Sequence, residues 1–448
     1  MLGSAKLRQL GSRLAANYWF IPSAMMITAV GLSFLLPWVD RRIGGVPGSI
    51  PGWIYEGGTD GARAVLSTIA GSMMTVAALV FSITIVGLTT ASQQFGPRLL
   101  RNFITDRGYQ VVLGTFLANF IYCLLVLRTV EEVGDEHFVP YVSIAVALLL
   151  AIAGVGVLVY FIHHAAFSLR ADNIVAAIGR ELKSTIDRLY PARQDDALGA
   201  NSRPESNGRK LPEGFPSGAR DVPARKSGYI QSIDQDRLAK LAQEHQLVLR
   251  LDYRPGQFLT EDETLVNCWP DIELPDDLLN DLNQCVVVGP QRPLAQDVES
   301  AIEQLVGLAL RALSPGINDP DTAILCIDQL TDALTRAAER DIPAALLPAE
   351  GEVSLVTYPL TFPRMVDQAL SRIRQHGRGS VPVTVRLLEA LAAIGQRAQN
   401  ESSRTAVSAQ AQMLKRSSDE AIPEENDRRL IDMRFRAVEK ALERSAAA

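Results

Sequence analysis

The chain has 448 residues, of which 47% are hydrophobic, and a formal net charge of −6 at pH 7. This length predicts two or three domains, and without a basic patch rich in aromatic residues we expect no nucleic-acid partner. The four cysteines are widely spaced and form no CxxC pair, so neither a disulfide framework nor a metal site is predicted, and no cofactor is expected.

Apolar residues are concentrated in the first 165 positions, where four membrane spans are expected. Each is an apolar run long enough to cross a bilayer as a helix. The expected spans cover residues 18–39, 64–92, 111–128 and 140–164. No small-residue cleavage site follows the first run, so it is interpreted as a retained span and not as a signal peptide.

The distribution of Lys and Arg predicts the orientation of these spans. Basic residues precede the first span and follow the second and fourth, whereas the loop after the third is acidic over residues 131–136. Because cytoplasmic loops carry an excess of Lys and Arg, we expect both termini in the cytoplasm and the protein in a bacterial inner membrane.

The second span carries a stripe of hydroxyl and amide side chains, reached by steps of four and three residues that follow one helix face. The stripe consists of Thr68, Ser72, Thr75, Leu79, Ser82, Val86, Thr89 and Gln93. Small polar groups could wet the wall of a pore, and the two apolar positions could close it by dewetting. The alternative is packing against another helix, which small hydroxylic residues also favour.

Two arginines, Arg98 and Arg101, follow the stripe at the expected cytoplasmic exit of the pore. They could favour anions, whereas the acidic loop on the opposite side could concentrate cations. The pattern therefore leaves ion selectivity open. The partners it predicts are the lipid bilayer, inorganic ions and further copies of the same chain.

The rest of the chain is expected to be cytoplasmic and to contain several segments. The predicted domains are the four-span domain at 1–165, a connecting helix at 166–190, a flexible linker at 191–227, a small β-containing module at 228–290, a mainly helical domain at 291–400, and a polar tail with a C-terminal helix at 401–448.

Oxygen-bearing side chains gather in SPGINDPDTA, at the break between two amphipathic segments. Asn318, Asp319 and Asp321 could hold a ligand or a divalent ion, although their spacing matches no EF-hand loop. The alternative is purely structural: Asp319 or Asp321 caps a new helix with Pro320 in its first turn.

Two long motifs, FSITIVGLTTASQQFGPRLLRNF and LAQDVESAIEQLVGLALRALSPGINDPDTA, occur together in this chain, and SGYIQSID and RPGQFL accompany them. This combination resembles the bacterial family of predicted membrane proteins known as domain of unknown function 2254. The resemblance covers the chain from the first span to about residue 340, and more loosely beyond. It implies a few N-terminal spans and a soluble C-terminal portion, and it brings no catalytic residue with it.

These patterns predict a membrane α-helical domain of four transmembrane helices, followed by a cytoplasmic α+β domain with a small β-barrel-like or sandwich-like module and helices. No Walker A loop, GxGxxG, GxSxG or zinc signature is present, so we expect no enzyme. One chain with one polar stripe cannot enclose a conduit. The predicted function is therefore a homo-oligomeric ion channel, lined by the second span, with a cytoplasmic vestibule or sensor. The alternative is a membrane-anchored sensor or scaffold whose cytoplasmic domain binds a partner or small ligand.

Overall fold

A computed structural model describes residues 19–43, 58–95, 106–133, 136–168, 170–192, 218–290, 292, 298–342, 346–349 and 352–447. The chain divides into two compact units, Met1–Asn173 and Ile174–Ala448. Each unit is described by itself.

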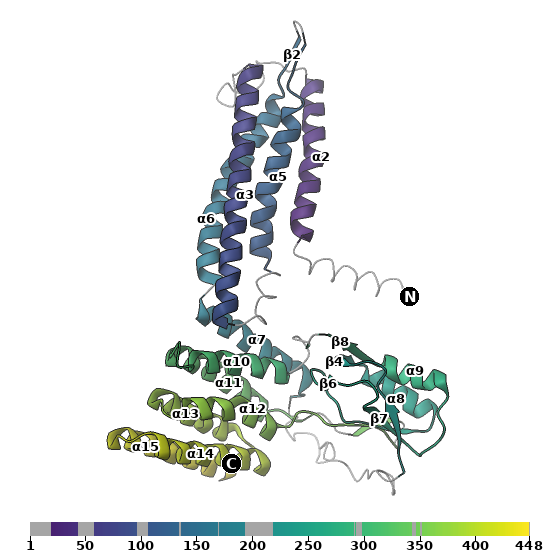
Figure 1. The fold of residues 1–448 in the computed structure, drawn as a ribbon, viewed down its shortest axis with the longest axis vertical. Coiled ribbons are helices and arrows are strands. Elements are labelled where there is room, and N and C mark those ends of the chain that lie inside the picture. The colour runs from purple at the N-terminus through teal and green to yellow at the C-terminus, as the bar shows by residue number, and fades with distance from the viewer. Residues whose placement is uncertain are drawn as a thin grey trace. The chain divides into compact units, whose positions relative to one another are not determined.

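Four long apolar helices form the N-terminal unit and lie side by side (Figure 1). They are α2 (Phe20–Ile43), α3 (Thr59–Phe95), α5 (Arg107–Leu127) and α6 (Tyr141–Ser168). A short hairpin of β1 (Glu131–Val133) and β2 (Glu136–Phe138) joins α5 to α6 at one end of the bundle. The prediction of four apolar helices is thus confirmed, and each is long enough to cross a bilayer.

The second predicted span begins earlier than expected, at Thr59 instead of residue 64. Ala62 and Leu66 are completely buried, so the face that packs against the bundle extends into this first turn. The charges of Asp60 and Arg63 concealed this extension from a search for uncharged runs.

A buried carboxylate ties α2 to the start of α6. Asp40 is only 4% exposed, and its carboxylate accepts hydrogen bonds from Val142 N (2.9 Å), Ser143 N (3.1 Å) and Ser143 Oγ (2.7 Å). The first N–H groups of a helix have no partner within the helix, so Asp40 caps α6 from a neighbouring element. Tyr122 of α5 donates its hydroxyl to Ser143 O at 3.0 Å, which brings a third helix into the same corner.

The C-terminal unit begins within α7 (Ala171–Leu189), at Ile174, and contains two open sheets. One has the order β3-β7-β5-β10-β9, in which β10 and β5 are parallel and the other pairs antiparallel; the second, β6-β4-β8, is antiparallel throughout. The strands are β3 (Arg220–Pro223), β4 (Gly228–Ile233), β5 (Val248–Leu251), β6 (Phe258–Leu259), β7 (Thr264–Trp269), β8 (Val286–Gly289), β9 (Leu346–Ala349) and β10 (Glu352–Thr357). Both sheets contribute to one apolar core with α8 (Gln235–Glu244) and α9 (Asp276–Gln284).

These sheets differ from the predicted module in closure and in membership. The described strands close no barrel, so the barrel-like or sandwich-like detail is not confirmed. β3 lies inside the predicted linker. It forms despite its Pro- and Gly-rich surroundings because it pairs with β7 and buries Val222. β10 lies beyond the predicted end of the module, because Leu355 completes the same core. Residues 193–217 of the predicted linker lie outside the described residues.

Six helices follow within the described chain, and they pack as three stacked hairpins (Figure 1). They are α10 (Val298–Ala312), α11 (Pro320–Ala338), α12 (Phe362–Gly377), α13 (Val381–Arg397), α14 (Glu401–Ala421) and α15 (Glu425–Ala447). Each helix packs against the corresponding helix of the next hairpin, so that α10 contacts α12, α12 contacts α14, α11 contacts α13 and α13 contacts α15.

The predicted polar tail from residue 401 is a packed helix, α14. Its apolar stripe is narrow, yet Val407 and Leu414 are buried. Gln410 is buried beside them and donates hydrogen bonds from its Nε2 to Asp367 Oδ1 and Ser371 Oγ, both at 2.9 Å. Composition predicts a polar tail here because the partners of these polar groups are distant in the sequence and leave no local signal.

Candidate functional site

The polar stripe of α3 faces away from its own bundle. The buried side chains of α3 include Leu66, Met73 and Val80, which lie on the opposite face at about 100° of rotation per residue. Seven stripe side chains are exposed: Thr68, Ser72, Thr75, Leu79, Ser82, Val86 and Thr89. Gln93 belongs to α3, but its side chain lies outside the described residues. Among the described residues of a single chain no helix covers the stripe, so packing across it would require another molecule.

Two apolar side chains interrupt the stripe, and both are more than half exposed. Leu79 is 52% exposed and Val86 is 60% exposed. They lie two helical turns apart on the same face, with Ser82 between them. In a ring of helices, each of these positions would form an apolar collar between hydroxylic rings.

Hydroxyl groups of the stripe donate to their own helix at Thr68, Ser72, Thr75 and Thr89. Thr68 Oγ1 donates to Ala64 O at 2.7 Å, Ser72 Oγ to Thr68 O at 2.8 Å, and Thr75 Oγ1 to Gly71 O at 2.9 Å. A hydroxyl has one donor hydrogen and two acceptor lone pairs, so this arrangement leaves lone pairs directed outward. Such a surface can accept hydrogen bonds from water or contact a cation. Lipid also tolerates it, because the donors are satisfied.

The second half of α3 has no buried face within the described chain. Val80 is the last buried residue, and every side chain over residues 81–90 is exposed or half-buried. These include Phe81 and Ile85, which lie away from the stripe. Arg98 and Arg101, the predicted pore exit, lie outside the described residues.

The second predicted site, at Asn318, Asp319 and Asp321, has the geometry of a helix start. Asp319 is the N-cap of α11, and its carboxylate accepts from Thr322 N (3.0 Å) and Thr322 Oγ1 (2.6 Å). These hydrogen bonds hold the pKa of Asp319 below its usual range. Pro320 occupies the first helical turn, so the predicted cap is confirmed.

The other two residues of this predicted site, Asn318 and Asp321, form no recognisable ligand-binding arrangement with Asp319. Asn318 and Asp321 are exposed, and Asn318 adopts a left-handed backbone conformation with φ 49°, which suits the turn. Within the described ranges, no group of three His, Cys, Asp or Glu side chains is arranged to hold a metal ion.

The structure brings together two motifs that the sequence places far apart. Arg254, from RPGQFL, lies with its Nη2 3.4 Å from Glu299 Oε2, in the first turn of α10. The other oxygen of Glu299 accepts from Gln368 Nε2 of α12. Glu299 is buried, so this ion pair links the turn before β6 to the stacked helices. Pairwise contact of this kind leaves no signal in either motif alone.

Sequence reasoning also missed a histidine–carboxylate pair. It lies at one end of the four-helix N-terminal unit, which we call the membrane unit. His164 Nε2 lies 3.1 Å from Asp106 Oδ2, and Asp106 is the N-cap of α5. An aspartate about one helical turn before a long apolar run is the signal that could have identified the cap. Nothing in the sequence indicates that the cap also reaches α6.

A model of the family described as "Predicted membrane protein (DUF2254)" matches residues 15–393. Uncharacterized proteins of Mycobacterium tuberculosis (strain H37Rv) and Mycobacterium bovis are each 31% identical to the chain over 429 residues, which cover 93% of this chain and 79% of the relative. No solved structure matches the chain.

Proposed function

The chain belongs to the DUF2254 family of predicted membrane proteins, and we propose that it forms a homo-oligomeric ion channel whose pore is lined by α3. The observation that carries the proposal is the exposed stripe of α3, a hydroxylic surface that the rest of the described chain leaves uncovered. Family membership supports a location in the membrane. It does not indicate the activity, which we infer from the geometry of this helix.

Water explains the stripe better than lipid does. A hydroxyl that donates to its own helix is tolerated in lipid, but nothing in lipid would favour several of them on one face. Outward lone pairs are useful where water or cations pass, and Leu79 and Val86 supply the apolar positions at which a pore can dewet.

The same helix supports the assembly of several copies. One stripe cannot surround a channel, so identical stripes must meet around an axis in a closed ring. The second half of α3, over residues 81–90, lacks cover from its own chain and offers its flanks to neighbouring copies. We propose that the partners are the lipid bilayer, copies of the chain and inorganic ions.

The remaining parts of the proposal follow from charge and composition. The basic flanks of the spans support an inner-membrane location with both termini in the cytoplasm. The C-terminal unit would then form a cytoplasmic vestibule or sensor. We propose that the protein is not an enzyme, because ion conduction requires a lined path through the membrane and involves no covalent step.

Ion flux into liposomes containing the purified full-length protein tests this function. Leu79→Ser and Val86→Ser should each raise flux about tenfold, because they replace an apolar collar by a polar one. Ile85→Ser is the matched control, since Ile85 is exposed one position away from Val86 but lies off the stripe. Flux that stays at the level of empty liposomes in all variants, or that rises equally with the control, would contradict the proposal.

The alternative role as a membrane-anchored sensor or scaffold is favoured by a different observation. The stacked hairpins α10 to α15 resemble the arrangement by which helical repeat proteins build extended binding surfaces. Under this alternative, α3 only anchors the chain in the membrane. The variants Leu79→Ser, Val86→Ser and Ile85→Ser should then leave the function of the protein in the cell unchanged.

A further inference from the structure

We propose that His164 and Asp106 form a proton-sensitive latch that joins the beginning of α5 to the end of α6. Asp106 Oδ1 accepts from Gly108 N at 2.6 Å and thereby caps α5. Its other oxygen, Oδ2, lies 3.1 Å from His164 Nε2. One carboxylate therefore serves two helices, and its bond to α6 depends on the imidazole.

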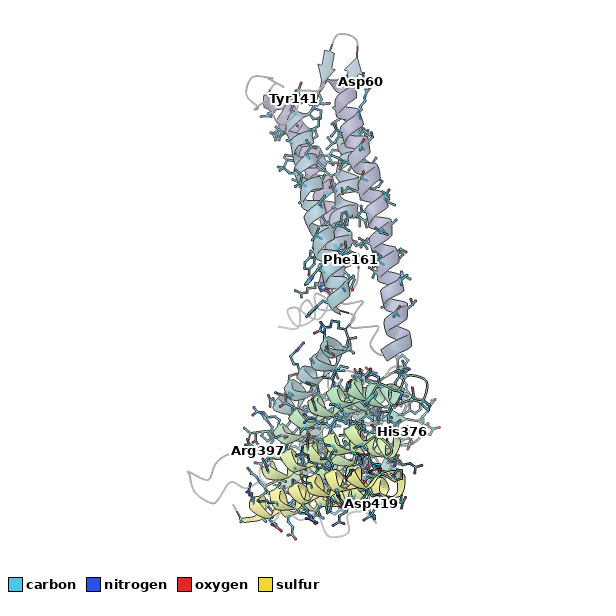
Figure 2. All side chains as sticks on the ribbon, turned by 90° about the vertical axis from the view of Figure 1, so that its left-hand side faces the viewer. Asp60, Tyr141, Phe161, His376, Arg397 and Asp419 are labelled. Atoms are coloured by element: carbon cyan, nitrogen blue, oxygen red, sulfur yellow. The ribbon has the colours of Figure 1, made fainter. Side chains whose placement is uncertain are left out.

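The imidazole ring of His164 packs against aromatic side chains. The ring of Tyr160 stacks on it with centroids 5.3 Å apart, and the ring of Tyr109 lies 5.4 Å away. Phe161, labelled in Figure 2, meets Tyr109 edge-on at 6.0 Å. A Cβ atom at Gly108 would lie 2.6 Å from His164 Nε2, so the first turn of α5 admits the ring only because this residue is glycine.

The latch side chains remain open enough to exchange protons with water. The side chains of His164 and Asp106 are 24% and 27% exposed. The other ionisable groups near this end of the bundle, among the described side chains, are Tyr109, Tyr160, His163, Arg107, Arg170 and Asp172. His163 stacks on Phe167, and Arg170 pairs with Asp172.

The first turn of α2, over residues 19–22, carries no ionisable side chain, and neither do the described side chains of α3 over residues 87–90. Asp106 is the carboxylate that the structure places in hydrogen-bond contact with the ring of His164, so this contact responds when the ring gains a proton.

Protonation changes the strength of the link. Histidine is the side chain whose charge changes between about pH 5 and pH 8. A neutral imidazole donates one hydrogen bond to Asp106, whereas an imidazolium forms a charge-assisted bond, which is roughly twice as strong. The ends of α5 and α6 are thus held more firmly as pH falls and released as pH rises. This inference does not depend on the proposed pore.

Hydrogen exchange on the full-length protein in detergent micelles tests the latch. After correction for the intrinsic exchange rate, amides 110–113 of α5 should exchange about fivefold more slowly at pH 5.5 than at pH 7.5, the ratio expected when a neutral hydrogen bond becomes charge-assisted. His164→Gln keeps a donor but cannot be charged, and Asp106→Asn keeps the cap oxygen but removes the negative charge. Both should abolish the ratio.

The matched control is His163→Gln, which removes the adjacent imidazole and should leave the fivefold ratio intact. An unchanged ratio in His164→Gln, no pH effect in the unmodified protein, or loss of the effect in His163→Gln would each overturn the proposal. Amides 120–123, near the other end of α5, report whether a variant has altered the fold of the bundle.

Discussion

Two apolar helices of the membrane unit, α5 and α3, treat their polar side chains in opposite ways. Half of the most apolar stretch of α5 is buried within the chain, against 22% of that of α3. Gln110 and Asn119 of α5 are among the buried residues, whereas the hydroxyls of the α3 stripe are exposed. α5 packs against α2, α3 and α6, which makes it the central helix of the bundle.

This contrast separates two causes of polarity in a membrane helix. Asn119 is 2% exposed, so packing inside one chain encloses its side chain, and its Oδ1 accepts a hydrogen bond from Cys123 Sγ of the same helix at 3.4 Å. The α3 hydroxyls have no such explanation within the described part of one chain, so their cause must be sought outside it.

The largest effect is expected inside α5. Phe116 is 1% exposed, and Phe116→Ala should lower the free energy of unfolding by about 3–5 kcal/mol because it leaves a cavity at the centre of the bundle. Met74→Ala on α3, outside residues 81–90, is the matched control, with an expected cost below about 1 kcal/mol because Met74 is 47% exposed. Denaturant titration in mixed micelles measures both. Equal costs would contradict the contrast.

A smaller loss is expected where α2 caps α6. Asp40→Ala removes the acceptor of three hydrogen bonds and should cost about 2–3 kcal/mol. Asp60→Ala, at an exposed position in the first turn of α3, should cost less than about 0.5 kcal/mol. The same titration compares them, and similar values would mean that the Asp40 cap contributes nothing specific.

In the C-terminal unit, Asp319→Ala should cost about 1 kcal/mol at pH 7 through loss of the α11 cap. The pKa of Asp319 is lowered in the folded chain, so its contribution is complete above the unfolded pKa of about 4 and is lost as pH falls through the folded value. The difference from the unmodified protein should therefore shrink in acid. Asp321→Ala is the control, and a calcium-dependent stability lost in both variants would instead indicate an ion site.

The smallest effect on stability is expected on the stripe. Thr75→Val replaces an exposed hydroxyl by a methyl group of similar shape and should change the free energy of unfolding by less than about 0.5 kcal/mol. Under the proposed function it should nevertheless reduce ion flux severalfold, because one ring of the wall loses its oxygen atoms. A stability change without a flux change would assign Thr75 to packing.

Local sequence was sufficient for the features that depend on local chemistry. Long uncharged runs identified the four apolar helices, and the order of Asp319 and Pro320 identified the start of α11. Both depend on interactions within one helix or turn, which neighbouring residues determine.

Features that depend on contacts between residues far apart in the chain could not be predicted from local sequence. Asp40 is unremarkable in the sequence, because its partners lie in α6. Composition alone predicts a tail in place of α14, because Gln410 and its partners come together only in the stacked hairpins. The stripe itself was found from spacing, but its exposure could be established only once the buried face of α3 was known.

The parallel pairing of β10 with β5 has a consequence for synthesis of the protein. β5 emerges from the ribosome about 100 residues before β10, and α10 and α11 are made in between. Until residue 357 has been translated, one edge of β5 has no partner strand and the core lacks Leu355. A nascent chain that stalls among these helices therefore carries an open apolar sheet edge, which is a substrate for chaperones and a starting point for aggregation.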